Sequence, residues 1–195
     1  MSSTNLLNEF VTYAAAAARA TDARLAGAYG VPLDWLQSGA ARYGIASGNT
    51  QGQHWQPDPI GRPLLVLPDV PLADPDDERL GAVDIGDLIA FNPHEPTRWW
   101  ARTGAAVMLN PEGVERGQHH AEPVHVHATP LDWLRAAGAG IVVLDWSGHL
   151  PLRLAGPPRL IAADLALAER LDRALNRPAP RHRIEVLARA LEAAE

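Results

Sequence analysis

The sequence contains no cysteine. This absence excludes disulfides, thiolate zinc sites and cysteine nucleophiles, and it fits a reducing cytoplasm. No run of about 18 apolar residues is present, so no membrane-spanning helix is expected. The first ten residues, MSSTNLLNEF, lack a basic region followed by an apolar one, which argues against a signal peptide. We therefore expect a cytoplasmic protein with no membrane partner.

Several catalytic and nucleotide-binding motifs are also missing. The chain has no glycine-rich phosphate loop ending in Lys-Ser/Thr, no Gly-x-Ser-x-Gly elbow and no His-Glu-x-x-His helix. Its formal net charge of −6 disfavours binding of nucleic acid over the whole surface, although a local basic patch would still allow contact. With 195 residues, 47% of them hydrophobic, the chain can form one domain with a substantial core.

The second half of the chain alternates strand and helix patterns. Three segments are typical of strands and two of amphipathic or capped helices, in the order PVHVHAT, PLDWLRAAGA, GIVVLDW, RLIAAD and LALAERLDRALNRP. Strands that alternate with helices predict a mostly parallel sheet covered by helices. We predict four parts: an N-terminal helical unit (1–46), a β-rich segment with loops (47–122), an α/β core (123–177) and a C-terminal helix (178–195).

The phrase PLDWL occurs twice, at residues 32–36 and 130–134. Proline suits the first turn of a helix, and an aspartate two residues later favours the positive end of the helix dipole. Thr129 can cap the second copy, whereas Val31 cannot cap the first with its side chain. Both copies therefore predict helix starts, and the different sequence around them argues against a domain repeat.

The order of elements in the second half resembles a Toprim domain, the α/β module of bacterial-type primases and topoisomerases. In that family a strand ends in Glu-Gly, and an Asp follows after two intervening residues. The positions matching Glu, Gly and Asp here are Ala128, Thr129 and Asp132. A later strand of the family ends in Asp-x-Asp, and its two acids match Asp164 and Ala166.

The resemblance implies an α/β fold, a small mostly parallel sheet with flanking helices, preceded by the helical unit and the β-rich segment. Toprim chemistry needs a carboxylate cluster that holds Mg²⁺, and two of its acids are alanines here. Asp132, Asp164 and Asp145, which ends the neighbouring strand, are the remaining candidates. The first two also fit plain helix-capping roles.

The implied function is a catalytically degenerate accessory or interaction module in the DNA metabolism of a phage or mobile element. A primase, a helicase or another protein would be its partner, and no cofactor is expected. A structural or interaction protein that contacts no nucleic acid is a further alternative.

A histidine cluster supports a different hypothesis, a small metal-dependent hydrolase. The stretch GQHHAEPVHVH contains His119, His120, His125 and His127. On a strand, His125 and His127 would share a face about 6.6 Å apart, and imidazoles at that spacing can share zinc or another divalent metal. The competing interpretation is that these are polar residues on an exposed face.

The stretch RWWAR combines basic and aromatic residues. Alternation along a strand would place Arg98, Trp100 and Arg102 on one face and Trp99 on the other. Such a face can stack bases and contact phosphates of single-stranded nucleic acid. The alternative is that Trp99 lies in the core and an arginine stacks on Trp100.

Overall fold

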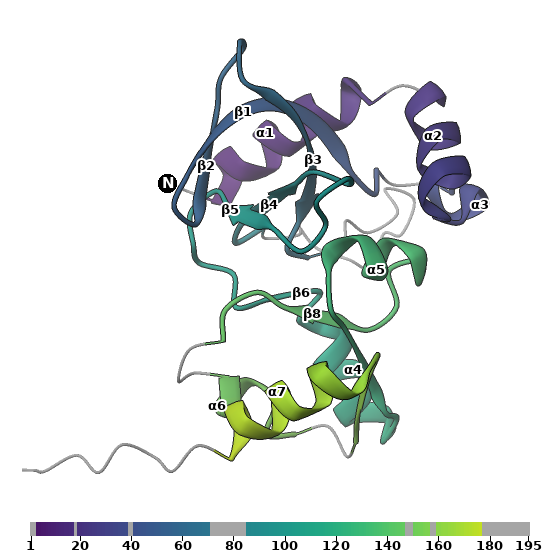
Figure 1. Cartoon of the computed structure of the whole chain (residues 1–195), viewed down its shortest axis with the longest axis vertical. Helices are drawn as coiled ribbons and strands as arrows, with labels where there is room; N and C mark the ends of the chain where they lie inside the picture. Colours follow the sequence, from purple (N-terminus) through teal and green to yellow (C-terminus); the bar gives the residue numbers. More distant parts are fainter. Residues whose placement is uncertain are drawn as a thin grey trace, which may run out of the picture.

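The computed structural model describes residues 3–17, 19–38, 41–70, 85–146, 150–156 and 159–176. Its upper part in Figure 1 is a closed barrel in the order β1-β2-β5-β4-β3. The strands are β1 (Gly44–Gln51), β2 (His54–Pro57), β3 (Arg62–Pro68), β4 (Leu88–Phe91) and β5 (Trp99–Ala101). Neighbouring strands are antiparallel except β2 and β5, which are parallel.

Strand β3 is apolar on both faces because each face packs against a different core. Leu64 and Val66 belong to a cluster with Trp55 and Trp100 that is covered by Leu6 and Phe10 of α1 (Ser3–Ala15). The intervening residues of β3 face a second cluster, which includes side chains from α2 (Arg19–Tyr29) and α3 (Leu33–Leu36). The continuous run LLVL therefore fits a strand buried on both sides.

A four-stranded sheet forms the lower part of the molecule in Figure 1, in the order β6-β8-β7-β9. Its strands are β6 (Met108–Leu109), β7 (Val124–His127), β8 (Ile141–Val143) and β9 (Leu160–Ala162). Strand β7 pairs in parallel with β8 and β9, and β6 pairs antiparallel with β8. The accompanying helices are α4 (Glu112–His120), α5 (Pro130–Arg135), α6 (Leu150–Arg153) and α7 (Leu165–Leu175).

The predicted fold class is wrong. We expected a Toprim-like α/β fold built on one small, mostly parallel sheet with flanking helices, and the structure has a closed mixed barrel beside a small mixed sheet. The error lies in the segment 47–122, where apolar stretches were not recognised as partners in one barrel. Three parallel strands do form in the second half, but the antiparallel strand β6 completes that sheet. The predicted C-terminal helix (178–195) falls outside the residues that the structure describes.

Both copies of PLDWL begin helices, and the two helices meet. Pro32 precedes α3, and Thr129 caps α5 by accepting a hydrogen bond from the backbone N–H of Asp132 at 3.1 Å. The rings of Trp35 and Trp133 lie edge to face with centroids 6.0 Å apart. The repeated phrase thus provides both halves of one contact between the N-terminal helices and the second sheet.

No helix among the described residues is long and apolar enough to cross a membrane.

Candidate functional site

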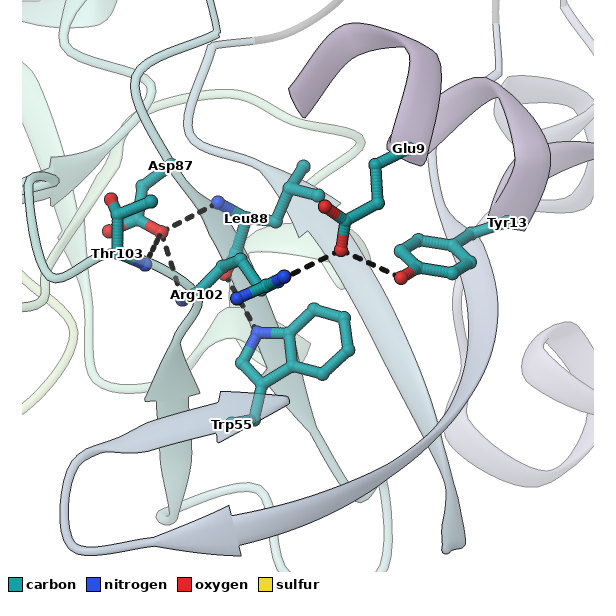
Figure 2. Close-up of polar contacts among 7 residues, drawn as sticks. All are labelled: Glu9, Tyr13, Trp55, Asp87, Leu88, Arg102 and Thr103. Carbon is teal, nitrogen blue, oxygen red and sulfur yellow. Dashed lines mark hydrogen bonds and ion pairs between the residues drawn. The ribbon is translucent and has the colours of Figure 1, made fainter. Parts of the chain in front are cut away.

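The turn that leaves the barrel is organised by one buried carboxylate, that of Asp87, which is fully buried just before β4. Its two oxygens accept backbone N–H groups at 2.8–3.2 Å from five residues, namely Leu88, Arg102, Thr103, Ala105 and Ala106. Figure 2 shows three of these contacts. Hydrogen bonds to an ionised carboxylate are stronger than those between neutral groups. Asp87 therefore fixes the path of residues 102–106, which connect the barrel to the second sheet.

Arg102, a predicted nucleic-acid contact, is instead part of a clamp between α1 and the barrel. Its Nε lies 2.9 Å from Oε1 of Glu9, and the two side chains are only 17% and 14% exposed. Tyr13 donates its hydroxyl to the same oxygen at 2.7 Å, and the guanidinium lies 5.9 Å from the ring centroid of Trp55 (Figure 2). Burial, assisted by the hydrogen bond to Glu9, raises the pKa of Tyr13 above its usual range. Arg102 therefore holds α1 against the barrel through its Nε.

Trp100, the second predicted contact, lies in the barrel core and is 3% exposed. The guanidinium groups of Arg62 and Arg98 lie 4.4 and 5.5 Å from its ring centroid. The alternative of an arginine stacked on Trp100 therefore describes this residue, which presents no free face to a base. Its neighbour Trp99 is half-buried and partly accessible. The structure thus keeps Arg98 beside the buried Trp100 and directs Arg102 to Glu9, so the three residues do not form one exposed face.

An open cleft of about 700 Å³ lies between the barrel and the second sheet. Seven of its lining side chains carry charge, an imidazole or an indole ring: His54, Arg98, Trp99, Trp100, Asp145, Trp146 and Arg170. The first four come from β2, β5 and the segment before β5, and the others from the segment after β8 and from α7. The cleft therefore collects aromatic and cationic groups from segments that are distant in the sequence.

The second-sheet wall of the cleft carries a stacked pair. The guanidinium of Arg170 lies 3.9 Å from the ring centroid of Trp146, within the range of a cation–π contact. Burial, and then the nearby charge of Arg173, lower the pKa of Arg170. The indole Nε1 of Trp146 is buried and has no hydrogen-bond partner among the residues described.

The turn held by Asp87 forms part of the same cleft, because Gly104 and Ala106 are in its lining. Gly104 has a φ of +80°, a conformation that favours glycine. A Cβ at this position would also approach Cε1 of His54 to 2.8 Å. The turn therefore needs glycine both for its backbone conformation and for its close approach to the imidazole.

Two of the three candidate carboxylates serve as helix-terminal groups. Asp164 caps α7 by accepting the backbone N–H of Leu167 at 2.8 Å. Asp132 accepts the hydroxyl of Thr129 at 2.7 Å and pairs with Arg135 at 2.9 Å. Asp145 is exposed and lies in the cleft lining.

The four candidate histidines lie on two elements. His119 and His120 are exposed in the last turn of α4, with ring centroids 4.8 Å apart. His125 is exposed on β7, and Nε2 of His127 donates to the carbonyl of Ala139 at 2.9 Å. Across the described ranges, no three His, Cys, Asp or Glu side chains are grouped so that they could hold a metal ion. The geometry gives the zinc hypothesis no support from these residues.

Sequence reasoning missed Trp99, Trp146, Arg170 and His54 as members of one site. Trp99 was assigned to the core because its neighbour was taken as the accessible ring. Arg170 lies on the polar side of an amphipathic helix, where arginines are common. No local sequence pattern signals that these residues meet.

Comparisons with known proteins add no assignment: no family model, no curated protein and no solved structure matches the chain. Function must therefore be argued from the geometry above.

Proposed function

We propose that this protein is a non-enzymatic binding module that holds single-stranded nucleic acid in the cleft between its barrel and its second sheet. The observation that carries this proposal is the convergence of Arg98, Trp99, Trp146 and Arg170 on one open cleft of about 700 Å³. Aromatic rings and guanidinium planes stack on bases of any sequence, and arginines also contact phosphates. An accessory role in DNA metabolism remains the prediction for such a module.

The local charge of the cleft differs from that of the whole chain. Its lining contains two arginines and one carboxylate, Asp145, whereas the chain carries a formal net charge of −6. A nucleic-acid strand in the cleft would therefore contact a locally positive surface on a protein whose net negative charge repels phosphates. We therefore expect weak binding that falls with added salt, because phosphate contacts release condensed counterions. Stacking should supply a large part of the affinity, since base–aromatic contacts contribute about 1–3 kcal/mol each.

The test of charge compares two arginines on α7. Arg170 lines the cleft, while Arg173 is exposed on the same helix, is not in the lining and donates to the carbonyl of Glu169. Binding of a fluorescein-labelled oligothymidylate is measured by fluorescence anisotropy at low salt. Arg170→Gln should weaken binding by about tenfold, since it removes a stacking and phosphate-binding group, while Arg173→Gln should change it little. Equal losses in both variants would show general electrostatic attraction and reject the cleft.

The test of stacking compares two tryptophans. Trp99 and Trp35 are both half-buried and both pack against the same apolar cluster, but only Trp99 lines the cleft. Trp99→Leu should weaken oligonucleotide binding by about tenfold, and Trp35→Leu should not. Both variants lose comparable packing, so thermal unfolding of each separates a binding effect from a folding effect. No binding of the oligonucleotide by the unmodified protein would leave a structural or interaction protein without nucleic acid as the answer.

A further inference from the structure

A second concave site lies on the barrel, between α2 and strands β1 and β3. This groove, called the α2 groove below, has a volume of about 500 Å³ and is closed at one side by the turn Asn92–His94 after β4. Its lining shares no residue with that of the cleft. The volume falls within the range of about 300–1,000 Å³ that is usual for small-molecule sites.

The floor of the α2 groove is apolar. Leu25 and Leu65 are 2% and 5% exposed and belong to the same apolar cluster, so they form a base that neighbouring side chains largely enclose. Ile45 and Pro93 continue this surface. A floor of this kind stabilises an apolar body by removing its surface from water, by roughly 25 cal/mol per Å².

Two arginines lie on the rim. Arg24 on α2 places Nη2 3.4 Å from Nε2 of His94, and the hydroxyl of Tyr29 lies 3.0 Å from the same nitrogen. Arg62 at the start of β3 donates to Oγ1 of Thr50 at 3.1 Å and covers the ring of Trp100. The groups that contact the two guanidiniums are therefore a hydroxyl, an imidazole and an indole, and none of them is a carboxylate.

The charge of these arginines is not balanced by an acid in the groove. No Asp or Glu is among the lining residues, and neither arginine forms an ion pair with any part of the chain that the structure describes. The nearby acid on α2, Asp22, accepts the hydroxyl of Tyr43 at 2.6 Å. The rim thus places two positively charged guanidinium groups, which donate hydrogen bonds, beside an apolar floor. This arrangement is complementary to an anion with an apolar body.

We propose that the α2 groove binds a small organic carboxylate with an apolar body, such as a medium-chain fatty acid. The carboxylate contacts Arg24 and Arg62, with guanidinium N–H groups donating to its oxygens, and the chain lies over Leu25, Ile45 and Leu65. Arginine suits this role because its planar donors match the two oxygens of a carboxylate. The site is independent of nucleic-acid binding in the cleft, so either proposal can fail without the other.

The experiment uses octanoate as the probe and octan-1-ol as its neutral counterpart, with binding to the full chain measured by isothermal titration calorimetry. Octanoate should bind at one site and at least about tenfold more tightly than octan-1-ol, because a charged hydrogen bond contributes more than a neutral one. Arg24→Gln should remove most of that difference while leaving octan-1-ol binding unchanged. Arg24 is exposed, so this variant should fold normally.

Arg19→Gln is the matched control, since Arg19 is an exposed arginine on the same helix outside the groove. It should bind octanoate as the unmodified protein does. Arg62→Gln supplies a second variant, checked for folding by thermal unfolding because its side chain covers Trp100. Absence of octanoate binding, equal affinity for octanoate and octan-1-ol, or octanoate binding unchanged in Arg24→Gln would each overturn the proposal.

Discussion

Replacing Asp87 by asparagine tests how far one carboxylate holds the connection between the barrel and the second sheet. The substitution preserves the shape of the side chain, removes its charge and turns one oxygen into an NH₂ group. In the best orientation the amide oxygen keeps the position of Oδ1 and accepts from Leu88, Arg102 and Thr103. The amide nitrogen then faces the N–H groups of Ala105 and Ala106, which lose their acceptor.

The magnitude follows from these contacts. A donor left without an acceptor in a buried site costs about 1–3 kcal/mol, and two donors are affected. The three remaining hydrogen bonds also weaken as they lose the charge of the acceptor, since such bonds are about half as strong between neutral groups. Water can reach part of the turn, because Ala105 is exposed and Ala106 half-buried. We therefore expect a loss of about 4 kcal/mol in the free energy of unfolding, a large share of the roughly 5–15 kcal/mol of a typical domain.

The measurement is equilibrium unfolding in urea, followed by circular dichroism, for the unmodified protein and two variants. Asp34→Asn makes the same chemical change at an exposed position in the first turn of α3 and should shift the unfolding free energy by less than about 0.5 kcal/mol. An Asp87→Asn variant within about 1 kcal/mol of the unmodified protein would refute the reasoning, because the five N–H contacts could not then be stabilising the turn as described.

Three further experiments probe the clamp, the buried acid beside Asp87 and a helix cap. A double-mutant cycle with Glu9→Gln and Arg102→Gln should give a coupling free energy of about 1–2 kcal/mol in urea unfolding. This exceeds the roughly 0–1 kcal/mol of exposed pairs because both side chains are mostly buried. A coupling free energy near zero would contradict this expectation. Burial and the neighbouring Asp87 raise the pKa of Asp69 from 3.8 to about 6, so between these values the folded protein retains a proton that the unfolded chain has lost. Asp69 therefore adds stability below about pH 4, and up to about 3 kcal/mol of it is lost as the pH rises through 6. Asp69→Asn should abolish this loss in thermal unfolding measured from pH 4 to 7. A variant with the same pH profile as the unmodified protein would contradict the prediction. Thr129→Ala should lower the unfolding free energy by about 1 kcal/mol in urea, since it removes the acceptor that caps α5, and no change would show the cap to be dispensable.

Several elements of the second half were predictable because their signals are local, whereas α4 and α6 were not predicted. Alternation in PVHVHAT predicted the strand that forms as β7, and Thr-Pro before an apolar run predicted the cap and start of α5. Periodicity and capping act over a few residues, so sequence reasoning reaches them directly.

The barrel was not predictable in this way, because its closure depends on contacts between distant segments. The stretch 45–63, which is polar and rich in glycine and proline, predicted a loop or a hairpin, and β1 and β2 form a hairpin within residues 44–57. The hairpin is stabilised by backbone pairing with β3 and by the single aromatic anchor Trp55, so its sequence shows little apolar alternation. The parallel contact that joins β2 to β5 pairs His54 with Ala101, a partnership that no local pattern encodes.

The repeated phrase PLDWL illustrates the same limit at the level of one contact. Each copy predicts its own helix from proline and aspartate, and each helix forms. Nothing within either copy indicates that Trp35 and Trp133 meet, because that contact is set by the packing of the N-terminal helices on the second sheet. The repeat has a structural role at the junction, which its sequence alone could not show.

The two walls of the cleft are joined through the residues that surround Asp87. The turn 102–106 contributes Gly104 and Ala106 to the lining, while Asp87 holds the N–H groups of the same turn. The main chain of Asp69 extends the connection, because its N–H donates to the carbonyl of Asp87 and its carbonyl accepts from Asn110 just after β6. A polar network therefore fixes the spacing between the wall that carries Trp99 and the wall that carries Trp146. Since the lining residues come from segments that meet only through this network, the site exists only in the folded chain, and local sequence motifs do not indicate it.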